Sequence, residues 1–124
     1  MSKVLIVEDD ASTAELIKFT LEGKGYDILL AGDGGEAVKK VRTDMPDLII
    51  LDIMLPTMDG FQVCQILKHN QAYQKIPIII LSAKIKKEDV DKGFETGADD
   101  YITKPFDPKH LMERIQHFIS KSGN

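Results

Sequence analysis

Short apolar runs alternate with stretches of helical spacing along the chain, and this alternation restricts the possible folds more than any other feature. Five runs rich in Ile, Leu and Val occur, at residues 4–7, 26–31, 47–51, 76–81 and 101–103. They show little polar alternation, which is typical of strands that helices cover on both faces. The runs therefore predict five strands of a parallel sheet.

The segments between the runs have the periodicity of amphipathic helices. Near the end of the chain, Leu111, Ile115 and Ile119 repeat every four residues and would share one helix face. Further helices are expected after the first run, ending at Gly23 or Gly25, and over the ranges 34–44, 59–70 and 88–96. Strictly alternating strands and helices predict an α/β, doubly wound (βα)5 fold that forms one domain over residues 1–124.

Composition narrows the class of protein. Sixteen Lys and Arg residues stand against 20 Asp and Glu residues, and the net charge of −4 argues against nucleic acid contact by this domain. Cys64 has no partner for an internal disulfide, which fits a reducing compartment. Residues 1–20 lack the long apolar stretch of a signal peptide, and no run reaches membrane-spanning length. We expect a cytoplasmic protein without membrane contact.

Chemically useful side chains follow four of the predicted strands. The parallel strands of such a sheet end at one edge, and ligands bind beyond it. The residues at these ends are Glu8, Asp9 and Asp10 after the first strand, Asp52 after the third, Ser82 after the fourth, and Lys104 after the fifth. Asp10 lies where the chain enters the first helix and is expected to cap it.

The carboxylates at this edge need a cation or protons. Two unit charges 4 Å apart repel by about 4 kcal/mol at an effective dielectric constant of 20. An all-oxygen ligand set favours Mg²⁺ or Mn²⁺ over zinc, and no His or Cys stands at a strand end. A carboxylate beside such a cation can attack phosphorus and form an aspartyl phosphate. Lys104 would add a second cation and Ser82 a hydroxyl donor.

The chain resembles the receiver domain of two-component response regulators over essentially its whole length. The matching motifs are "VLIVEDD", "PDLIILDIMLPTMDG", "PIIILSA" and "GADDYITKPF". The resemblance implies the strand order 2-1-3-4-5 and Mg²⁺-dependent transfer of a phosphoryl group from a histidine kinase or a histidine phosphotransfer protein. It implies a signalling switch that slowly hydrolyses its own aspartyl phosphate and is not a conventional enzyme.

The resemblance also implies roles for individual residues. Asp52 is the expected phosphoacceptor and a metal ligand. Asp9 would bind the metal directly, Glu8 through water, and Met54 through its backbone carbonyl. Met54 is also expected, with Lys84, to flank the approach of the hydrolytic water.

Three further positions match the switch of the family. Ser82 and Tyr101 stand at its hydroxyl and aromatic switch positions, and Lys104 matches the lysine that pairs with the phosphoryl group. The bond between Lys104 and Pro105 is expected to be cis. Phosphorylation would reshape the face made by the fourth helix, the fifth strand and the fifth helix, where a downstream partner or output domain would bind. The sequence leaves open whether the receiver stands alone.

Other classes of protein fit less well. A metal-dependent phosphatase with an aspartyl nucleophile uses Asp-x-Asp after its first strand, whereas here the nucleophile candidate follows the third and position 54 is Met. A flavin-binding module needs a Ser-, Thr- or Gly-rich loop after the first strand, where this chain has three acids. A receiver-like binding module that is never phosphorylated would normally lack one of the acids or the lysine, and none is missing here.

Overall fold

Ten elements alternate along the described residues, as expected from the apolar runs. The computed structural model describes residues 2–122. Its strands are β1 (Lys3–Val7), β2 (Asp27–Ala31), β3 (Leu48–Leu51), β4 (Ile78–Ser82) and β5 (Asp100–Thr103). Its helices are α1 (Ala11–Glu22), α2 (Gly34–Asp44), α3 (Gly60–Lys68), α4 (Lys87–Glu95) and α5 (Pro108–Ser122).

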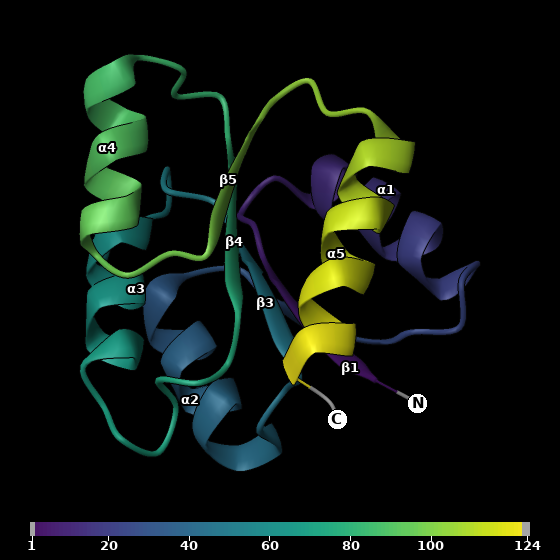
Figure 1. Ribbon diagram of the computed structural model, residues 1–124, viewed down its shortest axis with the longest axis horizontal. Coiled ribbons are helices and arrows are strands. Elements are labelled where there is room, and N and C mark those ends of the chain that lie inside the picture. Colours follow the sequence, from purple (N-terminus) through teal and green to yellow (C-terminus); the bar gives the residue numbers. More distant parts are fainter. Residues whose placement is uncertain (1, 123–124) are drawn as a thin grey trace.

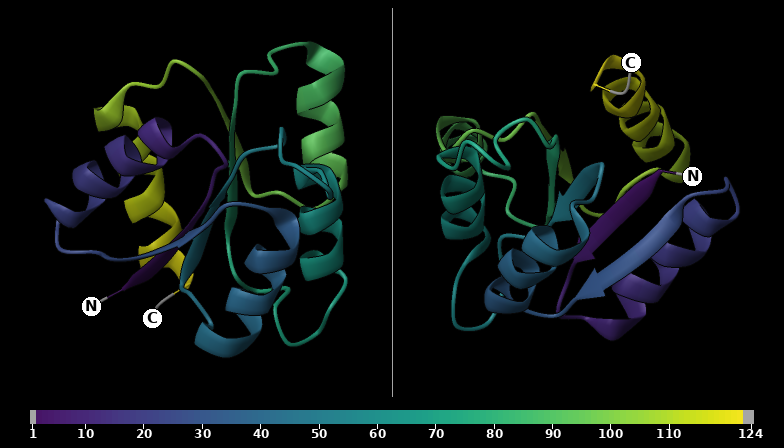
Figure 2. Two further views of the ribbon diagram at one scale, coloured as in Figure 1. Left: turned by 180° about the vertical axis from the view of Figure 1, so that it is seen from behind. Right: turned by 90° about the horizontal axis from the view of Figure 1, so that it is seen from below.

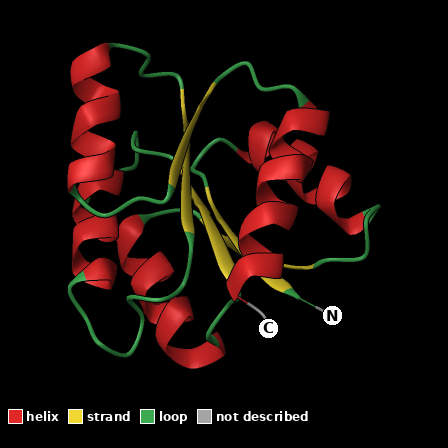
Figure 3. Ribbon diagram, viewed as in Figure 1, coloured by secondary structure: helices red, strands yellow, loops and turns green. Residues whose placement is uncertain are grey.

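The strands form one parallel sheet in the order β2-β1-β3-β4-β5. Helices α1 and α5 cover one face of it, and α2, α3 and α4 cover the other (Figures 1 and 2). Figure 3 shows the sheet as the central layer between these helices. The predicted doubly wound fold and its strand order are confirmed.

Two hydrophobic cores lie on the two sides of the sheet. Successive side chains of a strand point to opposite faces, so β1 sends Val4 and Ile6 toward the core beneath α1 and α5, and Leu5 and Val7 toward the other. All four side chains are essentially inaccessible. Burying a side chain of this size contributes about 1.5–3 kcal/mol, which explains why both faces of the strands are apolar.

Element boundaries follow local chemistry. Strand β4 begins at Ile78, two residues later than predicted, directly after Pro77, which has no N–H to donate to a ladder. Helix α1 ends with Gly23 as its C-cap, and Gly25 then takes a left-handed φ of 90°. The side chain of Asp10 accepts a hydrogen bond from the Thr13 N–H at 3.1 Å, so the predicted cap is confirmed.

The three histidines and the cysteine lie away from the carboxyl ends of the strands. Cys64 is buried in α3, and His69, His110 and His117 are all exposed. Within residues 2–122, no helix combines the length and the apolar character needed to cross a bilayer.

Candidate phosphoacceptor site

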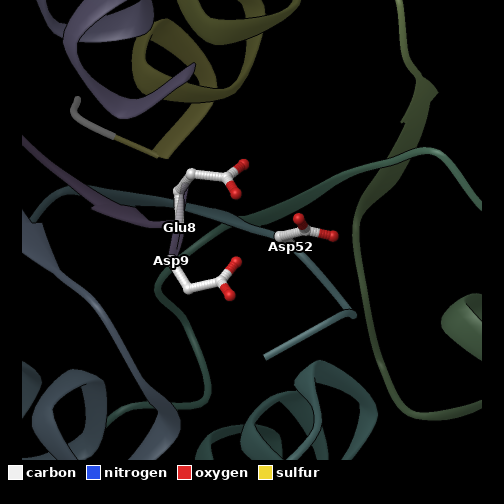
Figure 4. Close-up of side chains that lie close together, drawn as sticks. All are labelled: Glu8, Asp9 and Asp52. Atoms are coloured by element: carbon white, nitrogen blue, oxygen red, sulfur yellow. The ribbon is translucent and has the colours of Figure 1, made fainter. Parts of the chain in front are cut away.

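Three carboxylates meet where β1 and β3 end. The two strands are neighbours, with Val7 paired to Leu51, and the Asp52 N–H donates to the Val7 carbonyl at 3.0 Å. This pairing brings Asp52 level with the acids that follow Val7. One carboxylate oxygen from each of Glu8, Asp9 and Asp52 lies within 4.8 Å of the others (Figure 4).

Lys104 supplies the positive charge that this cluster needs. Its Nζ lies 2.6 Å from Glu8 Oε1 and 3.1 Å from Asp52 Oδ2. Glu8 and Asp52 are each only 6% exposed, whereas Asp9 is open to solvent. The lysine therefore pairs with the two buried acids, and Asp9 is left at the mouth of the site.

Burial and pairing shift the pKa values of this group. Burial raises the pKa of Glu8, and the Asp52 charge adds to it, although the hydrogen bond from Lys104 acts in the opposite direction. Burial, the largest single influence, would lower the pKa of Lys104, but the hydrogen bonds to Glu8 and Asp52 and the charges of these two acids together outweigh it, and the pKa is raised. Lys104 is thus held firmly in its charged form.

The backbone after Asp52 is fixed by a glycine that the sequence analysis did not single out. Gly60 opens α3, and its N–H donates to the Ile53 carbonyl at 2.8 Å. A Cβ atom at position 60 would lie 2.3 Å from the Asp52 carbonyl oxygen and 2.6 Å from the Ile53 Cα. Only glycine fits this approach, so α3 rests directly on the chain that carries Asp52.

The rim of the site contains the residues expected to influence hydrolysis. A cleft of about 610 Å³ is lined by Asp9, Met54 and Lys84, together with residues of the β3–α3 loop and α4. The Met54 N–H donates to Asp52 Oδ1 at 3.1 Å, and its side chain is 55% exposed. Met54 and Lys84 thus border the open side of the carboxylate cluster.

Ser82 and Tyr101 form a second group, joined through the backbone of Lys84. The fully buried Ser82 Oγ accepts the Lys84 N–H at 3.2 Å, and the Tyr101 hydroxyl donates to the Lys84 carbonyl at 2.6 Å. Partial burial is the main cause of a raised pKa at Tyr101. The Lys104 N–H donates to the Ser82 carbonyl at 2.9 Å, which connects this group to the carboxylates. The peptide bond between Lys104 and Pro105 is cis.

The donor chemistry of the cluster suits a small hard cation. Mg²⁺ prefers carboxylate oxygens, takes few of them from protein, and keeps several waters. Glu8, Asp9 and Asp52 offer only oxygen, and the exposure of Asp9 leaves room for water ligands. The three carboxylates predicted as magnesium ligands therefore lie together in the fold, and their chemistry fits the ion.

Comparison with known proteins places this site in a family. The family model described as the response regulator receiver domain matches residues 4–116. PhoP, the alkaline phosphatase synthesis transcriptional regulatory protein of Bacillus subtilis (strain 168), is 44% identical over 97% of this chain and 49% of its own length. MtrA, a DNA-binding response regulator of Mycobacterium tuberculosis (strain H37Rv), is 46% identical over 98% of this chain and 52% of its own.

A solved structure is similar as well. The receiver domain of the Pseudomonas aeruginosa PAO1 sensor histidine kinase PA1611, which has a magnesium ion coordinated in its active-site cleft, aligns with a TM-score of 0.89. It is 29% identical, and the match covers 96% of this chain and 98% of that domain. The present chain spans about half the length of the curated relatives. With the family model covering most of its length, the chain belongs to the response regulator receiver domain family.

Proposed function

We propose that this chain is a phosphorylation-dependent switch whose phosphoacceptor is Asp52. The observation that carries the proposal is the position of the Asp52 carboxylate, buried between Lys104 and the acids Glu8 and Asp9 at the carboxyl edge of the sheet. A single nucleophilic oxygen is held there beside one fixed cation and a set of metal ligands. This is the arrangement that phosphoryl transfer requires.

The transfer uses one carboxylate oxygen of Asp52. That oxygen attacks the phosphorus of a phosphohistidine on a histidine kinase or a histidine phosphotransfer protein. The new O–P bond forms as the P–N bond breaks, and the imidazole leaves with the electron pair of that bond and takes any proton it needs from solvent. Lys104, already 3.1 Å from Asp52, is placed to pair with an oxygen of the transferred group.

Asp9, Asp52, the Met54 carbonyl and, through water, Glu8 would hold Mg²⁺ or Mn²⁺. The ion would neutralise charge on the phosphoryl oxygens. The proposal is supported by the shared oxygen cluster and by the magnesium described for the similar Pseudomonas receiver. We do not assign phosphatase turnover to the site, because Met54 stands where an aspartyl phosphatase carries its second acid.

Phosphorylation is proposed to change the face made by α4, β5 and α5, and so to control the downstream partner. The Ser82 hydroxyl would donate a hydrogen bond to a phosphoryl oxygen, and its Lys84 link to Tyr101 would carry the change to this face. A downstream protein or an output domain would bind there. Because PhoP and MtrA are about twice as long as the matched region, any DNA contact is assigned to such an output domain.

Beryllofluoride, which mimics the phosphoryl group, provides the test of this switch. In NMR spectra with Mg²⁺, amide shifts should spread from residues 52–60 to residues 82–105 and into α5. Ser82→Ala should still bind beryllofluoride at Asp52, but its shifts should remain near the metal site. Wild-type shifts confined to the metal site would contradict the proposed output face.

The aspartyl phosphate is proposed to be long-lived, and Met54→Asn should shorten its life. The Met54 side chain gives a water no strong hydrogen-bond partner, whereas an amide at this position can orient water toward phosphorus. Decay of the phosphorylated protein, followed by intact mass, should be faster in Met54→Asn than in wild type. Ile66→Asn is the matched control, since Ile66 is an exposed apolar residue of α3. Equal or slower decay in Met54→Asn would contradict this assignment.

A further inference from the structure

Gly93 stands in the middle of α4, where its presence requires an explanation. Glycine is the poorest helix former after proline, and α4 is a nine-residue helix whose N-cap, Lys86, makes no side-chain capping bond. Of the residues of α4, all of which the structure describes, only Gly93 is buried. The absence of a side chain at this point must serve the packing beneath the helix.

The groups beneath Gly93 are Ile80 and Tyr101. These two residues are register partners on β4 and β5, so their side chains share one face of the sheet. A Cβ atom at position 93 would lie 2.9 Å from Ile80 Cδ1 and 2.9 and 3.1 Å from two carbons of the Tyr101 ring. Such distances are too short for packed carbon atoms. The bare backbone of Gly93 is therefore the surface against which the ring packs.

The same ring is tied to the loop after β4. Its hydroxyl donates to the Lys84 carbonyl, and the Lys84 N–H is bound by Ser82 Oγ. One side chain thus touches α4 through its ring and the Ser82 loop through its hydroxyl. Figure 1 shows α4 beside the edge strand β5, which carries this ring.

We propose that Gly93 is a positioning residue for Tyr101: its missing side chain forms the seat of the ring and couples α4 to the loop that follows Ser82. The signalling consequence rests on the proposed function. A side chain at position 93 would push the Tyr101 ring or α4 away, and Tyr101 would then no longer connect α4 to the loop after Ser82. Phosphoryl transfer would continue, because Gly93 is outside the carboxylate cluster and the atoms nearest to an added Cβ belong to Ile80 and Tyr101.

Gly93→Ala tests the seat directly. We expect acetyl phosphate to modify this variant at a rate within about twofold of wild type, since the site itself is intact. The NMR signals of the Tyr101 ring, assigned with Tyr101→Phe, should shift, and the pKa of its phenol, raised mainly by burial, should fall toward the ordinary tyrosine value. The beryllofluoride-induced shifts in α4, β5 and α5 should fall by about half or more.

Gly34→Ala is the matched control. A Cβ atom there would lie 2.9 Å from both Met58 Cβ and Val63 Cγ2, which is the same degree of crowding in a different helix. This variant should lose stability but keep the wild-type Tyr101 signals and beryllofluoride response. If Gly93→Ala leaves Tyr101 and that response unchanged, or if Gly34→Ala alters them equally, the proposal is overturned. A wild-type chain that fails to respond to beryllofluoride would refute the proposed switch, while the ring shifts would still test the seat.

A double-mutant cycle guards against loss of folding in Gly93→Ala. In an Ile80→Val background, which removes the Cδ1 atom, Gly93→Ala is combined with Tyr101→Ala. Gly93→Ala changes the unfolding equilibrium constant by some factor, both with Tyr101 and with Tyr101→Ala. We expect this factor to be at least about threefold smaller with Tyr101→Ala, where the ring is absent. Equal effects of Gly93→Ala with Tyr101 and with Tyr101→Ala would overturn the assignment of the ring as the group that requires Gly93.

Discussion

Asp52→Asn should abolish phosphorylation. With acetyl phosphate and Mg²⁺, the wild-type chain should gain the mass of one phosphoryl group, stable in acid and labile in base, and the variant should gain none. The reason is chemical: an amide lacks the anionic oxygen that forms the O–P bond. The change keeps the side chain's volume, and an amide oxygen still accepts the Met54 N–H, now 3.1 Å from Asp52 Oδ1. The fold should therefore be retained.

Asp89→Asn provides the control for the loss of an acid near the site. Asp89 lines the same cleft as Asp9 and Met54 but lies on α4, outside the carboxylate cluster. This variant should be phosphorylated at close to the wild-type rate. Modification of Asp52→Asn at the normal rate would show that another side chain, Glu8 or Asp9 first of all, is the acceptor.

The carboxylate cluster can be predicted from the sequence because it depends on only two features. Acids follow the first and third apolar runs, and parallel strands end at the same edge. Once β1 and β3 pair, Asp9 and Asp52 must approach each other. The helix boundary at Gly34–Asp44 and the Asp10 cap are likewise set by neighbouring residues.

Contacts between distant segments are the part that the sequence does not reveal. Lys104 and Glu8 are separated by 96 residues, and their pairing depends on the path of the loop after β5. The sequence indicated a lysine for the phosphoryl group, but not the ion pair it makes with Glu8. Gly60 and Gly93 are similar cases: each is required by a backbone or ring that passes beside it, and the letters alone show only a glycine in a helix.

Lys104→Met should strongly destabilise the metal-free protein at neutral pH. Removing one partner of a buried ion pair leaves the other charge uncompensated, at a cost of about 3–5 kcal/mol for full burial. Lys104 is 20% exposed, and Glu8 can take a proton, so we expect a loss of about 2–3 kcal/mol in chemical unfolding. Lys87→Met is the control. Lys87 forms a 2.8 Å ion pair with Asp91, but its side chain is 89% exposed, so loss of this pair should change the free energy of unfolding little.

The loss should depend on pH in a defined direction. The folded pKa of Glu8 is already above its ordinary value of 4.5, and without Lys104 it would rise further. A carboxyl whose pKa is higher in the folded state binds protons preferentially there, so ionising it lowers stability as pH rises from the unfolded toward the folded pKa. The difference in the free energy of unfolding between wild type and Lys104→Met should therefore be smallest below pH 4.5 and reach its full size at neutral pH. A gap that stays constant across this range would contradict the ion-pair explanation.

Magnesium should offset the same defect, because the variant keeps Glu8, Asp9 and Asp52 and lacks only the competing cation. We expect Lys104→Met to bind Mg²⁺ about three- to tenfold more tightly than wild type, since two acids now lack a positive neighbour. Saturating Mg²⁺ should then narrow the stability gap by mass action. Asp9→Asn should show the opposite behaviour: it removes a like charge from the cluster, so the metal-free protein gains stability, and Mg²⁺ no longer raises it appreciably. Equal Mg²⁺ affinities for wild type and Lys104→Met would mean that Lys104 does not share the charge of the metal ligands.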